Sequence, residues 1–142
     1  MKTKVLLVDD DASVHAAFTG GLRREGYDVI NAFDSDEALV CLQTHPGIDL
    51  VLLGLCVPVE SGWRILERLH WSRPLLPVII LTALPDQEAA AQAAGVGALL
   101  EKPLDIPVLL QTMRELLAEP LEAGLARIAG KSPLRHQPIA LC

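Results

Sequence analysis

The stretch VLLVDDD at residues 5–11 decides the fold class of this 142-residue chain. Four consecutive apolar residues, without polar alternation, are typical of a strand buried on both faces of a parallel sheet. Similar runs recur at residues 50–53 and 78–81, and each is followed by a helical pattern. Short apolar runs that alternate with helices predict βα units, and therefore a parallel sheet covered by helices on both faces.

The whole chain divides into five such units and an extension. We expect strands at residues 5–8, 27–32, 50–53, 78–81 and 98–100, and helices at residues 12–25, 35–44, 63–71, 85–94 and 106–118. Right-handed crossovers leave few topologies, and our first choice is the flavodoxin-like (βα)5 doubly wound sheet with strand order 2-1-3-4-5. Residues 1–119 are expected to form this domain. Residues 120–142 contain three prolines and two glycines, and we expect a helix followed by a loose tail.

Composition narrows the classes of partner. The net charge is −6, which argues against nucleic acid or an anionic membrane as a direct partner. The three cysteines, Cys41, Cys56 and Cys142, have no metal-site spacing and fit reduced thiols in a cytoplasmic protein. No apolar stretch approaches the length of a membrane span. We therefore expect a cytoplasmic protein whose partners are proteins.

The ends of the expected strands bring polar groups together. Ligands of such sheets bind at the carboxyl ends of the strands, where this sequence has Asp9, Asp10, Gly54, Thr82 and Lys102. Two carboxylates, a hydroxyl and an ammonium group suit magnesium-assisted phosphoryl transfer. The middle strand, however, ends without a nucleophilic side chain.

Four stretches carry a family resemblance. They are VLLVDDD at residues 5–11, DLVLLGLCVP at 49–58, LTA at 81–83 and AGVGALLEKP at 94–103. In this order and at these spacings they resemble the receiver domain of bacterial response regulators, over Lys4 to about Glu119.

The resemblance implies a role for each residue at the strand ends. In the family, an aspartate at the position of Gly54 accepts a phosphoryl group from a histidine kinase. The acids matching Asp9 and Asp10 hold magnesium, together with the backbone carbonyl of the residue matching Cys56. The residues matching Thr82 and Lys102 contact the phosphate.

Two positions depart from the family pattern. Gly54 has no side chain to phosphorylate, and Leu99 stands where an aromatic residue swings inward on activation. A phosphate adds about −1.5 to −2 charge, and this input is absent without the acceptor. Losing a carboxylate ligand also weakens metal binding, so we expect magnesium to bind weakly or not at all. Lys102 is then expected to pair with Asp9 or Asp10 instead.

The favoured function is therefore a signalling module, not an enzyme, that acts without phosphorylation at the usual site. It would bind a protein partner or form a homodimer through the face of residues 85–118, which many receivers use for dimerisation. Other origins of Gly54 are a substitution introduced into the chain and an alignment displaced by one residue.

Two other functions are considered. IAGKSP at residues 128–133 resembles the entry to the ATPase domain of enhancer-binding activators, so the chain could be the N-terminal regulatory part of a DNA-binding transcription activator. A flavodoxin-like enzyme or nucleotide binder is disfavoured because GxGxxG, P-loop and GxSxG motifs are missing.

Overall fold

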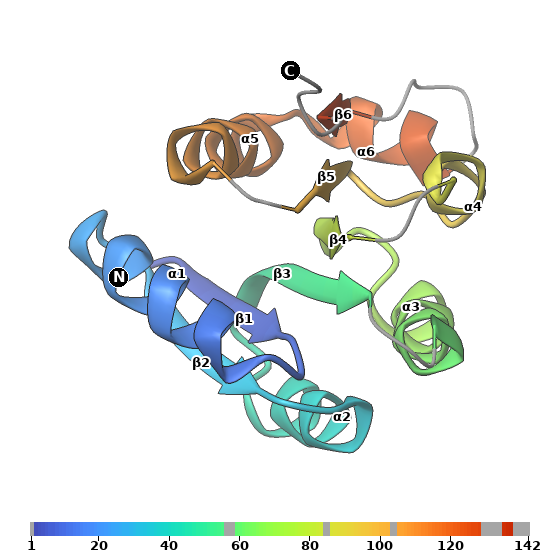
Figure 1. The fold of residues 1–142 in the computed structure, drawn as a ribbon. Coiled ribbons are helices and arrows are strands. Elements are labelled where there is room, and N and C mark those ends of the chain that lie inside the picture. Colours follow the sequence, from blue (N-terminus) through green and yellow to red (C-terminus); the bar gives the residue numbers. More distant parts are fainter. Residues whose placement is uncertain (1, 56–58, 84–85, 103–104, 129–134, 138–142) are drawn as a thin grey trace.

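The computed structural model describes residues 2–55, 59–83, 86–102, 105–128 and 135–137. They form one parallel sheet with helices on both faces (Figure 1). The strands are β1 Lys4–Val8, β2 Asp28–Ala32, β3 Ile48–Leu55, β4 Val78–Thr82, β5 Ala98–Glu101 and β6 Arg135–Gln137. The helices are α1 Ala12–Arg24, α2 Ser35–Thr44, α3 Val59–Ser72, α4 Glu88–Ala93, α5 Ile106–Ala118 and α6 Leu121–Ile128.

The predicted topology is confirmed. The sheet order is β2-β1-β3-β4-β5-β6, so the first five strands have the flavodoxin-like order 2-1-3-4-5. The helix expected after residue 119 is present as α6. The strand β6, which pairs with the outer edge of β5, is not expected from the sequence. Among the described residues, no helix is long and apolar enough to cross a membrane.

Two apolar clusters hold the helices to the sheet. Alternate residues of β1 point to opposite faces, as the pleat of a strand requires. Val5 and Leu7 join the cluster under α1 and α5, whereas Leu6 and Val8 join the cluster under α2, α3 and α4. Because all four are at most 4% exposed, β1 is buried on both faces, as its unbroken apolar run predicts.

Aspartates begin three of the helices. Asp11, Asp34 and Asp105 cap α1, α2 and α5, and each carboxylate accepts a hydrogen bond from a backbone N–H in the first turn. Such caps satisfy donors that have no partner inside the helix. The cap at Asp11 fixes the point at which the chain leaves β1 and turns into α1.

Gly26 follows α1 in a conformation that favours glycine. Its φ is +92°, and a Cβ added there would meet nothing within 4 Å. The constraint at Gly26 is therefore backbone conformation alone. Gly20, inside α1, is exposed and also has open space where a Cβ would lie, but its φ is ordinary for a helix.

The same substitution at these two glycines should change stability in opposite directions. Gly26→Ala is expected to lower the free energy of unfolding by about 1–2 kcal/mol, because an L side chain is strained at positive φ. Gly20→Ala should raise it by about 0.5–1 kcal/mol, since alanine loses less backbone entropy in a helix. Urea denaturation measures both, and effects of equal sign would contradict the assigned backbone conformations.

Candidate functional site

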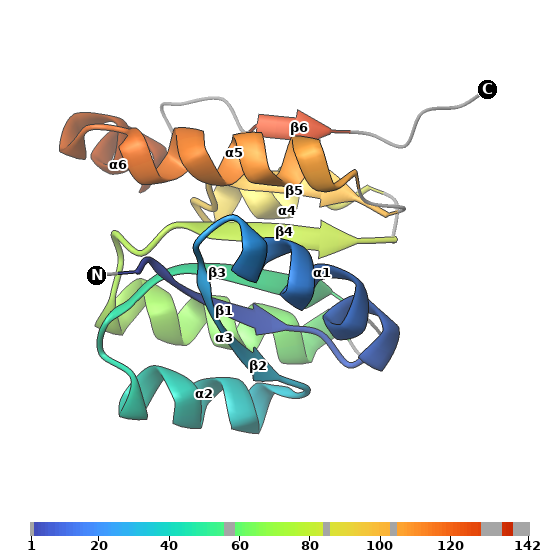
Figure 2. The same ribbon diagram turned by 90° about the vertical axis from the view of Figure 1, so that its left-hand side faces the viewer.

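The carboxyl ends of β1, β3, β4 and β5 meet at one edge of the sheet, where the arrowheads point the same way (Figure 2). Asp9 follows β1, Gly54 lies near the end of β3, Thr82 ends β4 and Lys102 follows β5. The sequence prediction that these residues converge is confirmed for Asp9, Gly54 and Lys102 by the contacts below.

A buried ion pair occupies the centre of this edge. Nζ of Lys102 donates to Oδ2 of Asp9 at 2.9 Å, and the two side chains are 23% and 1% exposed. Oδ1 of Asp9 accepts the backbone N–H of Asp11 at 2.9 Å. Both carboxylate oxygens of Asp9 therefore have a donor. A buried carboxylate costs several kcal/mol in lost hydration unless it is paired in this way.

The carboxylate of Asp9 lies where a side chain at position 54 would begin. A Cβ on Gly54 would be 2.3 Å from Oδ2 and 2.7 Å from Cγ of Asp9. It would also be 3.0 Å from the backbone oxygen of Val8. In this arrangement, the ion pair and any side chain at position 54 exclude each other.

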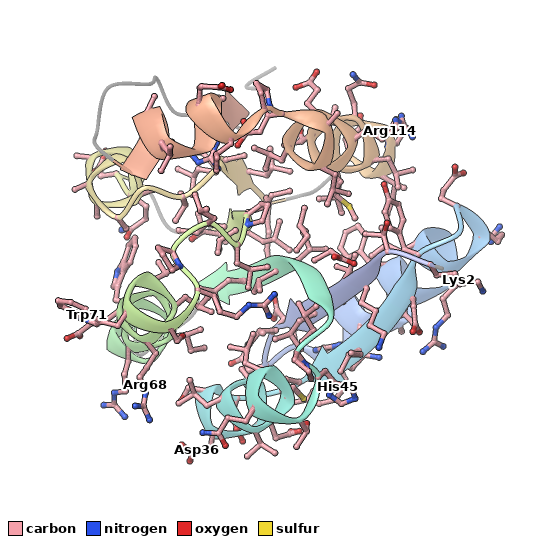
Figure 3. All side chains as sticks on the ribbon, turned by 180° about the vertical axis from the view of Figure 1, so that it is seen from behind. Lys2, Asp36, His45, Arg68, Trp71 and Arg114 are labelled. Carbon is pink, nitrogen blue, oxygen red and sulfur yellow. The ribbon has the colours of Figure 1, made fainter. Side chains whose placement is uncertain are left out.

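Other charged side chains are placed differently. Lys2, Asp36, Arg68 and Arg114 project from the outer surfaces of their elements (Figure 3). Asp10 is also exposed, and Lys102 pairs with Asp9. Of the two acids that could have paired with this lysine, the structure thus selects the buried one.

Thr82 and Leu99 are fully buried. The carbonyl of Thr82 accepts the backbone N–H of Lys102 at 2.7 Å, which ties the end of β4 to the start of the loop that carries the lysine. Leu99 packs in the apolar cluster on the α3 side of the sheet. Cys56, the remaining residue of the predicted site, lies outside the described residues.

The residues that the structure describes do not fit a divalent metal as arranged. Nowhere in residues 2–55, 59–83, 86–102, 105–128 and 135–137 do three or more metal-ligating side chains gather. Magnesium needs available carboxylate oxygens. The Asp9 carboxylate is taken by Lys102, and Gly54 offers no oxygen on a side chain.

His15 is a residue of the site that the sequence analysis missed. It is 6% exposed, and its Nε2 donates to the backbone carbonyl of Asp9 at 2.8 Å. Its Nδ1 lies 2.6 Å from Oδ1 of Asn31, and its ring stacks on Phe33 at 4.1 Å. His15 therefore holds the backbone of Asp9. The available signal was its helical spacing from Phe18 and Leu22, which are also buried.

Asp11, and not Asp9 or Asp10, is the helix cap at this edge. The pKa of Asp11 is lowered from its ordinary value, first by the hydrogen bond from the Ser13 hydroxyl and then by the Ser13 backbone N–H. The cap stabilises the fold above the pKa of an unfolded aspartate, and this contribution is lost as pH falls through the lowered pKa. Asp9 is thus left for the pair with Lys102.

The comparisons with known proteins agree with this geometry. The family model of the response regulator receiver domain matches residues 5–114. The chain therefore belongs to the response regulator receiver domain family, whose members are parts of signalling regulators.

Solved structures share the fold. A CheY-like receiver domain protein from Methanospirillum hungatei is similar with a TM-score of 0.76 and 28% identity, over 82% of this chain and 94% of that one. The chemotaxis response regulator CheY4 of Vibrio cholerae is similar with a TM-score of 0.74 and 28% identity, over 82% of this chain and 99% of that one.

The curated relatives are longer proteins. The transcriptional regulatory protein ZraR of Salmonella typhimurium is 34% identical over 87% of this chain and 28% of its own length. The transcriptional regulatory protein GlrR of Escherichia coli is 35% identical over 92% of this chain and 30% of its own length. The chain thus spans less than a third of these two relatives.

Removing the charge of Lys102 should expose the cost of the buried carboxylate. Lys102→Met is expected to lower the free energy of unfolding by about 3 kcal/mol, because loss of one partner leaves a buried charge unpaired. Lys102→Arg, which keeps the charge, should cost less.

A double-mutant cycle with Asp9→Asn, followed by urea denaturation, isolates the pair. The double variant should lose clearly less stability than the sum of the two single losses. Additive losses would mean that Asp9 and Lys102 do not interact in solution.

Proposed function

We propose that this chain is a receiver module that signals without phosphorylation at position 54, through a protein partner that recognises a preset conformation. The observation that carries the proposal is the buried Lys102–Asp9 pair, seated in the space that a side chain at position 54 would need. The chain has the fold of a receiver, and an internal carboxylate provides the anion that faces the lysine.

The proposed loss of the switch rests on chemistry at three positions. Gly54 offers only a hydrogen atom where a phosphoryl group would have to bond. Lys102 already donates to a carboxylate, so an incoming anion would have to compete for it. Leu99 is buried and lacks the ring of the aromatic residue that it replaces. Each of the three removes one step by which added charge would change the conformation.

A preset conformation still allows regulation. A partner shifts a two-state protein only by its difference in affinity for the two states. A receiver held in one state by an internal ion pair would bind its partner with a constant affinity, and its output would follow the concentration of the partner.

Magnesium is proposed to bind weakly or not at all. A carboxylate at position 54 is missing, and using Asp9 as a ligand would require breaking its pair with Lys102. Loss of a partner that merely supports a metal ligand costs about 10–100-fold in affinity, so loss of a ligand itself should cost at least about that much.

A second candidate is the regulatory part of a DNA-binding transcription activator. The chain matches 24% of the length of the DNA-binding transcriptional regulator NtrC of Rhizobium meliloti, at 32% identity. A match covering 92% of this chain must also include part of the segment after Glu119, as with GlrR. The reading frame beyond Cys142 tests this candidate, since an ATPase or DNA-binding domain encoded there would support it.

The first test concerns phosphoryl transfer. Incubation with acetyl phosphate and magnesium should leave the intact mass of the chain unchanged, because no carboxylate stands at position 54. A phosphorylatable CheY-type receiver treated in parallel is the control. A stoichiometric phosphoryl adduct on this chain would overturn the proposal.

The second test uses two substitutions at position 54. Gly54→Ala and Gly54→Asp should each displace the Asp9 carboxylate and lower the free energy of unfolding by about 1–3 kcal/mol. Only Gly54→Asp adds a carboxylate, so only this variant should regain stability when millimolar magnesium is added. Thermal denaturation with magnesium or with EDTA measures the difference. Magnesium stabilisation of the unaltered chain would contradict the proposed loss of the metal site.

A further inference from the structure

The outer edge of β5 carries a strand that comes from the far end of the chain. β6 pairs with β5 in parallel, with Ala98 opposite Arg135, Leu99 opposite His136 and Leu100 opposite Gln137. Without β6, β5 would be the last strand on this side of the sheet. This surface is separate from position 54, and the inference does not rest on the proposed function.

The edge of β5 has few features of its own that discourage pairing with another chain. Ala98, Leu99 and Leu100 are at most 4% exposed, and β5 contains neither lysine nor proline. Unpaired N–H and C=O groups on such an edge are a template for a second chain. Natural sheets protect edges of this kind by covering them, and here β6 is the cover.

The segment that leads to β6 is anchored to the domain. A parallel strand needs a crossover of a dozen or more residues, and α5 and α6 supply it. Arg127 of α6 is 7% exposed and pairs with Glu119. Gly124 is buried, and a Cβ on it would meet Leu75 at 3.6 Å. These contacts hold α6 against the sheet, so β6 is delivered to its own β5.

We propose that residues 121–137 are an intramolecular cap that keeps the chain monomeric by occupying the edge of β5. When β6 is displaced, the occupant of this edge is a second copy of the chain. Two identical edges meet across a twofold axis, which makes the strands antiparallel, so β5 would pair with β5 of the other copy. The face of residues 85–118 can then form a homodimer only after β6 has left.

The first experiment tests whether the cap lies on its own chain. In a background with the three native cysteines changed to serine, Ala98→Cys/Arg135→Cys places two thiols directly across neighbouring strands, which lie about 4.8 Å apart. This is within disulfide range. Oxidation should give a bridge within the monomer.

Its control is Ala98→Cys/Gln137→Cys, which is two residues out of register and should bridge far less. Absence of the first bridge, equal bridging in both variants, or a bridge that links two chains would overturn the proposal.

The second experiment removes the pairing in the full chain. Arg135→Pro/His136→Pro/Gln137→Pro takes away all three backbone N–H donors of β6. The matched control changes the same residues to threonine, which keeps the donors and favours strands. Light scattering after size exclusion reports the mass.

The unaltered chain and the threonine variant should be monomers. The proline variant should dimerise with a dissociation constant lower by at least about tenfold. A monomeric proline variant with an unchanged circular dichroism spectrum, or a dimeric unaltered chain, would overturn the proposal. Neither outcome bears on phosphorylation at position 54, so the two proposals fail separately.

Discussion

The buried carboxylate of Asp9 is the constraint on which the candidate site depends. A carboxylate with 1% exposure cannot be hydrated, and the chain provides two donors for it. One comes from the next turn of backbone at Asp11, and the other comes from Lys102, 93 residues away. The second contact joins the end of β1 to the end of β5, on either side of β3 and β4. The absence of a side chain at Gly54 is what allows the carboxylate to lie between them.

The same arrangement explains why two opposite properties coexist. The receiver fold is retained because its strands, core clusters and helix caps do not involve the side chain at position 54. The chemistry of the site changes because one missing side chain alters the partners of both Asp9 and Lys102. An ion pair of this kind is weak evidence for stability, since desolvation offsets much of its attraction. Its clearer effect is to give the site a single arrangement of charges.

Most of the fold could be predicted from the sequence, because each buried strand is an unbroken apolar run and three helices begin at an aspartate. β6 could not be predicted in this way. Arg135, His136 and Gln137 have no apolar pattern, and they form a strand because β5 offers an unpaired edge. In the site, Gly54 and Lys102 were found from the motifs. The choice of Asp9 over Asp10 required the three-dimensional structure, because it depends on the backbone that His15 holds.

β5 links the two parts of the molecule for which we propose roles. Its outer edge pairs with β6, and Lys102 leaves its end with a backbone hydrogen bond to Thr82. Spatial proximity alone does not make two sites coupled. Here, however, both would have to move with the same four-residue strand, since the backbone of Lys102 is fixed to β4 and its side chain is fixed to Asp9. A strand held on both edges and at its end has little freedom to shift. This makes a receiver with one state, and not a switch between two, the arrangement most consistent with the contacts of β5.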